Sequence, residues 1–167
     1  MSSARFAGEL LAARDARQEL LTAALAAGRP AVLFLSLNLP GLYKVPPGAD
    51  RLFAWGFERI AAAFPGSLLL AREADALGQF ALRALDTDPV AAKRLCIGLE
   101  EALPAARLLD LDVHSPSAGQ VGRGALGLPP RPCLLCQRPA VDCIRTKRHR
   151  CDQVVAEAHA LLAHFRP

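Results

Sequence analysis

Cysteine and histidine are concentrated in the stretch PPRPCLLCQRPAVDCIRTKRHRC, residues 129–151. Four of these residues follow the spacing C-x2-C-x6-C-x5-H: Cys133, Cys136, Cys143 and His149, with Cys151 as an alternative fourth ligand. Two thiolates at C-x2-C spacing can bind one tetrahedral zinc ion, and the later pair can complete the site. The second half of the pattern departs from common zinc-finger spacings, so the alternative is that the cysteines pack or stay free. The pattern therefore predicts a candidate Zn²⁺ site.

Two aspartates in LLDLDV, residues 108–113, form a second candidate metal site. On a β-strand Asp110 and Asp112 project from the same face, because side chains alternate along a strand. Mg²⁺ binds one or two carboxylates together with phosphate oxygens of a substrate, and phosphoryl transfer uses such a metal between the attacking and leaving oxygens. The alternative is an edge strand with two solvated acids. Glu100 is a candidate third carboxylate or general base, or a residue of the helix surface.

Basic residues dominate the C-terminal third of the chain. Between residues 116 and 150 the only acid is Asp142, against seven basic residues: Arg123, Arg131, Arg138, Arg145, Lys147, Arg148 and Arg150. Most of them are arginine, whose planar fork can bind a phosphate in two places at once. No aromatic residue lies between Phe80 and Phe165 to stack on bases, which argues against a nucleic-acid partner and favours a compact phosphate ligand. The alternative is a solvated surface that keeps the protein soluble.

Length and composition limit the class of protein. A chain of 167 residues favours a single domain, 1–167, and 52% hydrophobic residues are enough for a core. No apolar run reaches membrane-spanning length, so we expect no membrane partner. The N-terminal segment lacks the apolar region of a signal peptide and carries acids, so we expect a cytoplasmic protein. Five cysteines in that compartment favour metal binding or packing over disulfides, and Cys96 is expected in the core of a helix.

The elements that position these residues follow from periodicity and turn residues. We expect helices at 8–28 and 50–64, a helix with Asp88 as N-cap that ends before Pro104, and a closing helix at 152–165. We expect strands at 31–39 and 107–116, a hairpin of 67–74 with 79–85, and a strand or loop at 118–126. This order indicates an α+β fold with a mixed, mostly antiparallel sheet packed with helices, in which the Cys/Arg-rich segment precedes the closing helix.

The motif RLLDLDV, followed by LGLPPRPCLLCQRPAVDCIRTKRH, resembles the holo-citrate lyase synthases, also called apo-citrate lyase phosphoribosyl-dephospho-CoA transferases. AARDARQELL, residues 12–21, and LNLPGLYK, residues 37–44, are similar to further stretches of that family. The resemblance implies a nucleotidyltransferase-type enzyme that acts on triphosphoribosyl-dephospho-CoA. It would transfer the 2'-(5''-phosphoribosyl)-3'-dephospho-CoA group to a serine of the acyl-carrier (gamma) subunit of citrate lyase and release pyrophosphate.

Such a reaction agrees with the candidate residues, because a triphosphate needs cations around it and a metal at the leaving group. Our hypothesis is that Asp110 and Asp112 hold Mg²⁺ and that Glu100 assists catalysis. Nine basic residues are candidates to bind the phosphates of the donor: Arg14, Arg17, Lys44, Arg51, Arg107, Arg123, Arg131, Arg145 and Lys147.

Three other functions compete with this interpretation. The analogous transferase of malonate decarboxylase would use the same donor with another carrier, although the Cys/Arg motif argues for the citrate lyase type. A small zinc-binding module could contact nucleic acid through its arginines, would not need Asp110 and Asp112, and would bind less tightly as salt rises. A structural or adaptor protein would bind no triphosphate.

Overall fold

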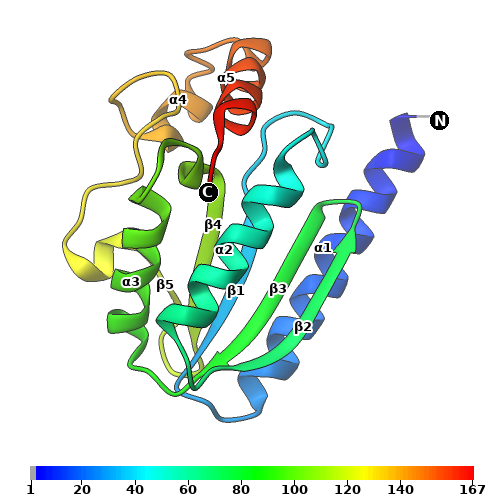
Figure 1. Ribbon diagram of the computed structural model, residues 1–167. Coiled ribbons are helices and arrows are strands. Elements are labelled where there is room, and N and C mark those ends of the chain that lie inside the picture. Colours follow the sequence, from blue (N-terminus) through cyan, green and yellow to red (C-terminus); the bar gives the residue numbers. More distant parts are fainter. Residues whose placement is uncertain (1–2) are drawn as a thin grey trace.

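The computed structural model describes residues 3–167, which form one sheet with helices on both faces (Figure 1). The strands pair in the order β2-β3-β1-β4-β5, and every pairing is antiparallel. Their bounds are β1 (Ala31–Leu37), β2 (Leu68–Asp75), β3 (Gly78–Leu85), β4 (Leu109–Ser115) and β5 (Gly119–Val121). The helices are α1 (Ser3–Ala26), α2 (Ala49–Ala63), α3 (Pro89–Glu101), α4 (Ala140–Arg145) and α5 (Cys151–His164). The predicted α+β class is confirmed.

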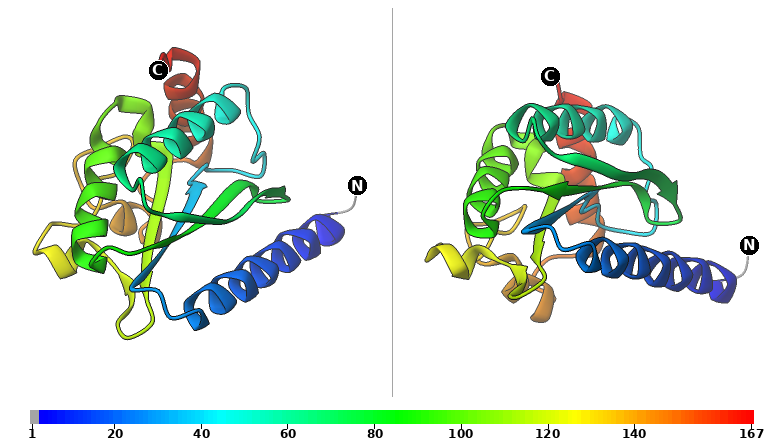
Figure 2. Two further views of the ribbon diagram at one scale, coloured as in Figure 1. Left: turned by 60° about the horizontal axis from the view of Figure 1, so that its bottom comes forward. Right: turned by 90° about the horizontal axis from the view of Figure 1, so that it is seen from below.

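Different helices cover the two faces of the sheet: α1 lies on one face, and α2 and α3 lie on the other (Figure 2). The alternation of side chains along β1 produces this arrangement. Leu33 and Leu35 join the main core with Phe53 of α2, whereas Val32 packs with Leu21 of α1 in a smaller cluster. The sheet is therefore buried on both faces where helices cross it.

The predicted N-cap of α3 is confirmed, and two glycines allow a tight turn and a close contact between elements. Asp88 caps α3, because its side chain accepts a hydrogen bond from the Ala91 N–H at 2.9 Å. Gly78 has a φ of 95° at the β2–β3 turn, a conformation that glycine adopts without strain. Gly56 allows α2 to pack closely on β4, since a Cβ atom there would lie 2.8 Å from Leu109 Cδ2.

The structure also contains elements that the sequence patterns did not predict. These are α4 and two short 3-10 helices, Pro104–Leu108 and Arg123–Leu126. The first 3-10 helix takes up the start of the strand predicted at 107–116, and the predicted strand or loop at 118–126 is divided between β5 and the second. Helix α1 begins at Ser3, earlier than predicted. Among the described helices, none combines the length and the apolar character that a membrane span requires.

Candidate functional site

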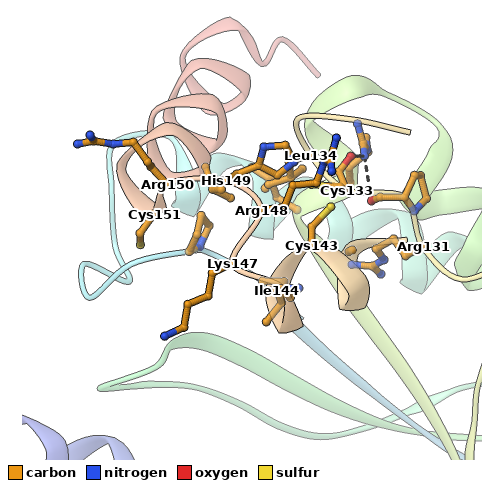
Figure 3. A pocket seen from close by; sticks show the side chains of 17 residues that line it. Arg131, Cys133, Leu134, Cys143, Ile144, Lys147, Arg148, His149, Arg150 and Cys151 are labelled. Atoms are coloured by element: carbon orange, nitrogen blue, oxygen red, sulfur yellow. Dashed lines mark hydrogen bonds between the residues drawn. The ribbon is translucent and has the colours of Figure 1, made fainter. Parts of the chain in front are cut away.

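A pocket of about 760 Å³ lies between the first 3-10 helix, α4 and the first turn of α5 (Figure 3). Its wall is mostly apolar and includes Leu108, Leu134, Ile144 and Val154. Five basic residues also line it: Arg107, Arg131, Lys147, Arg148 and Arg150. None of the described lining residues is Asp or Glu. The pocket therefore combines an apolar surface with a strong attraction for anions.

Three of these cations have no carboxylate partner among residues 7–167. Arg107 Nη2 donates to the carbonyl oxygens of Pro132 at 3.2 Å and Cys133 at 2.7 Å, which fix the guanidinium but leave its charge unneutralised. No ion pair joins Lys147 or Arg148 to an acid in that part of the chain. Guanidinium and ammonium groups with free charge are the groups that bind phosphate oxygens in proteins.

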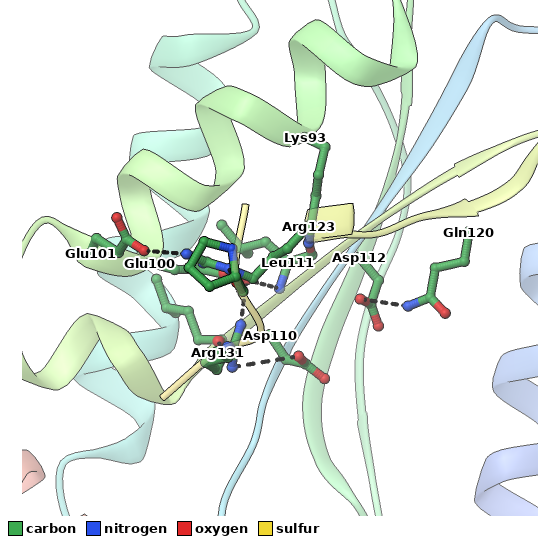
Figure 4. Close-up of polar contacts among 11 residues, drawn as sticks. Lys93, Glu100, Glu101, Asp110, Leu111, Asp112, Gln120, Arg123 and Arg131 are labelled. Carbon is green, nitrogen blue, oxygen red and sulfur yellow. Dashed lines mark hydrogen bonds and ion pairs between the residues drawn. The ribbon is translucent and has the colours of Figure 1, made fainter. Parts of the chain in front are cut away.

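The first part of strand β4 has an outer edge that β5 does not cover. Strand β5 pairs only with Val113–Ser115, so the backbone before Val113 needs other partners on that side. Glu100 Oε1 accepts a hydrogen bond from the Leu111 N–H at 3.0 Å, and Lys93 Nζ donates to the Leu111 carbonyl at 2.6 Å (Figure 4). Side chains of α3 thus replace the missing strand at the residue between the two aspartates.

Lys93 is a site residue that the sequence analysis missed. Lys93 and Glu100 are seven residues apart, close to two helical turns, so both project from the same face of α3. Both are buried, with 5% and 3% of the residue exposed. The alternative that Glu100 lies on the helix surface is wrong. The sequence does contain a signal for this pair, namely two charged residues on the otherwise apolar face of an amphipathic helix.

Asp110 and Asp112 project from the same face of β4, as predicted, while Leu109, Leu111 and Val113 are fully buried on the other face. Gln120 Nε2 donates to Asp112 Oδ1 at 2.8 Å. Burial, followed by the negative charge of Asp112, raises the pKa of Asp110 to about 6. A divalent cation would relieve this repulsion, so the pair suits a hard metal ion. The alternative of a solvated edge strand is wrong in one respect, because β4 lies between β1 and β5.

Arg131 connects the aspartates to the pocket. Its Nη2 lies 2.7 Å from Glu100 Oε1, and its Nη1 lies 3.9 Å from Asp110 Oδ1 and 3.3 Å from the Leu109 carbonyl oxygen. The same side chain lines the pocket and a smaller hollow of about 440 Å³ that Arg107 and Arg123 also line. The predicted residues Arg107, Arg131 and Asp110 therefore belong to one connected region.

Arg17 has a different environment from the one that phosphate binding would require. Its guanidinium forms two hydrogen bonds with the Asp75 carboxylate, at 2.8 and 2.7 Å, and lies 4.4 Å from the centre of the Phe80 ring. These contacts join α1 to the β2–β3 hairpin. Arg17 is outside the pocket, and so is the exposed Arg14 one helical turn earlier.

The other predicted phosphate ligands are divided between the pocket and the surface. Lys147 lines the pocket, whereas Arg51 is exposed on α2. Lys44 donates to the Leu39 carbonyl oxygen at 2.6 Å, and burial lowers its pKa. Arg123 pairs with Glu101 at 2.9 Å, and Arg145 pairs with Asp142 at 3.0 Å on α4.

The three cysteines and the histidine predicted as metal ligands come together beside the pocket. The ligand atoms of Cys133, Cys136, Cys143 and His149 all lie within 4.8 Å of one another, a group that can hold a metal ion. The Cys136 and Cys143 sulfurs are 3.6 Å apart, and His149 Nε2 is 3.4 Å from Cys136 Sγ. Hydrogen bonds from the Arg138 backbone and then from His149 lower the pKa of Cys136 to about 6. A thiolate at neutral pH is the form that binds metals.

The structure also decides between the two candidates for the fourth ligand. His149 completes the group, whereas Cys151 lies outside it, exposed at the start of α5. Cys133, Cys143 and His149 belong to the lining of the pocket. Cys96 is fully buried in the core of α3, as predicted.

Residues 7–165 match the protein family described as apo-citrate lyase phosphoribosyl-dephospho-CoA transferase. A protein of Citrobacter koseri with that name is 31% identical over 158 residues, which cover 92% of this chain and 86% of that protein. One of Escherichia coli O6:K15:H31, with the same name, is 32% identical with the same coverage. The Haemophilus influenzae protein CitXG is 32% identical over 157 residues, and there the match spans 34% of the longer chain. These matches confirm the resemblance found in the sequence motifs.

Proposed function

The chain belongs to the family of apo-citrate lyase phosphoribosyl-dephospho-CoA transferases, and we propose that it attaches this prosthetic group to the acyl-carrier (gamma) subunit of citrate lyase. The donor is triphosphoribosyl-dephospho-CoA, and the acceptor is a serine of the carrier. We place the reaction in the cytoplasm, where the five free cysteines would stay reduced.

In the proposed reaction the serine oxygen attacks the α-phosphorus of the 5''-triphosphate. The new bond joins the serine oxygen to that phosphorus, the bond from phosphorus to the bridging oxygen breaks, and pyrophosphate leaves with the electron pair. The serine proton passes to a base or to solvent. Negative charge builds up on the leaving pyrophosphate, so catalysis depends on cations fixed near that position.

The pocket is the observation that carries this proposal, because its lining has five basic residues and no acid among those described. Arg107 and Arg131 are held by carbonyl and carboxylate oxygens, so they present their remaining N–H groups without further ordering. Lys147 and Arg148 add two cations with free charge. The apolar wall suits the chain that links the phosphates of the CoA moiety to its thiol end.

Asp110 and Asp112 would hold Mg²⁺, which when bound would neutralise charge on the phosphates. Burial, followed by the negative charge of Asp112, raises the pKa of Asp110, and a cation bound by both carboxylates would relieve that repulsion. We assign Glu100 a positioning role in place of a general base, since its Oε1 already contacts both the Leu111 N–H and Arg131. Lys93 is also a positioning residue, since it donates a hydrogen bond to the Leu111 carbonyl oxygen.

The intact mass of the apo carrier subunit, after incubation with this protein, Mg²⁺ and the donor, tests the proposal. We expect a mass gain equal to the phosphoribosyl-dephospho-CoA group, lost with EDTA and lost in Asp110→Asn and Asp112→Asn, both of which should remain folded. A gain that survives EDTA would leave the transferase but remove the aspartate–metal hypothesis. A gain only with the carrier of malonate decarboxylase would replace citrate lyase as the target.

We also infer that Cys133, Cys136, Cys143 and His149 bind zinc. A tetrahedral ion with Zn–S bonds of about 2.3 Å separates its ligand sulfurs by about 3.8 Å. The observed separation of 3.6 Å between Cys136 and Cys143 supports that arrangement. The segment is also folded around its ligands, because the Cys133 N–H donates to the Arg138 carbonyl at 2.8 Å. Zinc would then stabilise the pocket wall without taking part in the chemistry.

Metal analysis of the purified protein tests this second proposal. We expect about one zinc ion per chain, in keeping with a closed four-ligand site. Cys136→Ser should lower the zinc content and the melting temperature. Cys151→Ser is the matched control, since Cys151 lies outside the ligand group, and it should change neither. Folded wild-type protein that neither contains nor takes up zinc would contradict the proposal.

A further inference from the structure

Helix α4 exposes an apolar and basic surface beside the pocket. Val141, Ile144 and Arg145 are three and four residues apart, so they share one side of the helix. Val141 is 56% exposed, Ile144 is 77% exposed, and the Arg145 side chain is 76% exposed. Cys143 is buried on the other side, within the ligand group. We call Val141, Ile144 and Arg145 the α4 surface.

The charge around the α4 surface is almost entirely positive. Arg138, Lys147 and Arg148 are exposed on either side of it, and no ion pair joins them to an acid among residues 7–167. The acid within α4 is Asp142, which pairs with Arg145. A partner with acidic side chains would therefore be attracted here and would find exposed apolar side chains at the centre of the contact.

The position of the pocket restricts where a protein acceptor can bind. Ile144, Lys147 and Arg148 belong both to the pocket lining and to the exposed surface, so they form its mouth (Figure 3). The acceptor serine must reach the donor through that mouth, and the acceptor must therefore cover the residues around it. Val141 and Arg145 do not line the pocket. They can therefore contact a protein partner without contacting the donor.

We propose that the α4 surface is the docking site of the carrier subunit, and that the carrier presents acidic side chains and a small apolar contact next to its acceptor serine. This inference rests on the proposed function, since it names the partner of the same pocket. Cys143 of α4 belongs to the ligand group of Cys133, Cys136, Cys143 and His149, so a zinc ion bound there would also fix the docking surface at the mouth.

The double variant Val141→Asp, Arg145→Glu tests the docking site. It reverses the charge and removes the apolar contact without changing a pocket residue. Affinity for the apo carrier, measured by fluorescence anisotropy without donor, should fall about tenfold or more, as is typical when opposite charges across an interface become like charges. Affinity for dephospho-CoA should stay unchanged. Wild-type affinity for the carrier should also fall as salt rises.

The matched control is Arg94→Glu, Leu95→Asp, which likewise replaces an arginine by Glu and an apolar residue by Asp, at exposed positions of α3 outside the pocket. Zinc content and melting temperature confirm that both variants are folded. Unchanged carrier affinity in the α4 variant overturns the inference, and so does an equal loss of dephospho-CoA affinity. If the wild type binds the carrier through α4 but transfers no group, the docking site stands and the proposed reaction fails.

Discussion

Replacing Asp110 by Asn should stabilise the protein at neutral pH while it abolishes transfer. The Asp110 carboxylate is partly buried and faces the charge of Asp112, and these two causes raise its pKa from 3.8 to about 6. An amide of the same shape carries no charge, so it removes the repulsion. We expect the gain in the absence of divalent cations, since a bound cation would offset the same repulsion in the wild type.

The magnitude follows from the shift in pKa. Two pKa units correspond to roughly 3 kcal/mol for a group shielded from water. Solvent reaches 36% of the Asp110 side chain, and its screening reduces the expected gain to about 1 kcal/mol. For a chain of this size that free energy raises the melting temperature by about 2–4 °C.

The dependence on pH has a definite sign. Between pH 3.8 and about 6 the folded protein keeps the Asp110 proton while the unfolded chain ionises. Unfolding then releases a proton, so the free energy of unfolding of the wild type falls as pH rises through this window. Asp110→Asn should lack that decrease, and the two proteins should have equal stability below the window.

Urea unfolding in EDTA at a series of pH values measures this difference. Asp15→Asn is the control, since Asp15 is exposed on α1, and its stability should match that of the wild type at every pH. A variant at Asp110 that is no more stable than the wild type at pH 7 would refute the reasoning, because burial and the charge of Asp112 would then not disfavour the Asp110 carboxylate in the folded protein.

Two further substitutions, together with one control substitution, test how β4 is held. Lys93→Met leaves the Leu111 carbonyl without its donor and should lower the free energy of unfolding by about 1–3 kcal/mol in urea titration; a change below the error of the method would contradict its role. Gly56→Ala places a Cβ against Leu109 and should cost about 1–3 kcal/mol, with a lower melting temperature. Gly98→Ala is the control, because a Cβ at position 98 would have no neighbouring atom within 4 Å, and it should stabilise α3 by roughly 1 kcal/mol. Equal effects of the two alanine substitutions would argue against close packing at Gly56.

Local features of the site could be predicted from the sequence because they depend on neighbours along the chain. Alternation in β4 is sufficient to place Asp110 and Asp112 on one face, and the spacing of Cys133 and Cys136 is sufficient to indicate a shared ligand group. The cap at Asp88 depends in the same way on nearby backbone groups.

The tertiary structure decided which acid each arginine pairs with. The sequence alone did not distinguish Arg17 from Arg131, since both were candidate phosphate ligands. In the structure Arg17 pairs with Asp75 of the β2–β3 hairpin, whereas Arg131 pairs with Glu100 beside the pocket. The difference arises because β1 pairs with β3 and β4, which are distant in the chain, and this order determines which helix faces which strand edge. Lys93 became a site residue for the same reason, since β5 is too short to cover the edge of β4.

The sequence by itself therefore determined the residue types, their local faces and the family, because periodicity, ligand spacing and motif similarity are properties of the chain. Only the tertiary structure decided which cations have free charge and line the pocket, and which are already paired. The physical reason is that a charged side chain attracts a ligand most strongly where no closer group of opposite charge offsets it. Arg107 meets that condition through contacts with two carbonyl oxygens that lie 25 and 26 residues away in the chain.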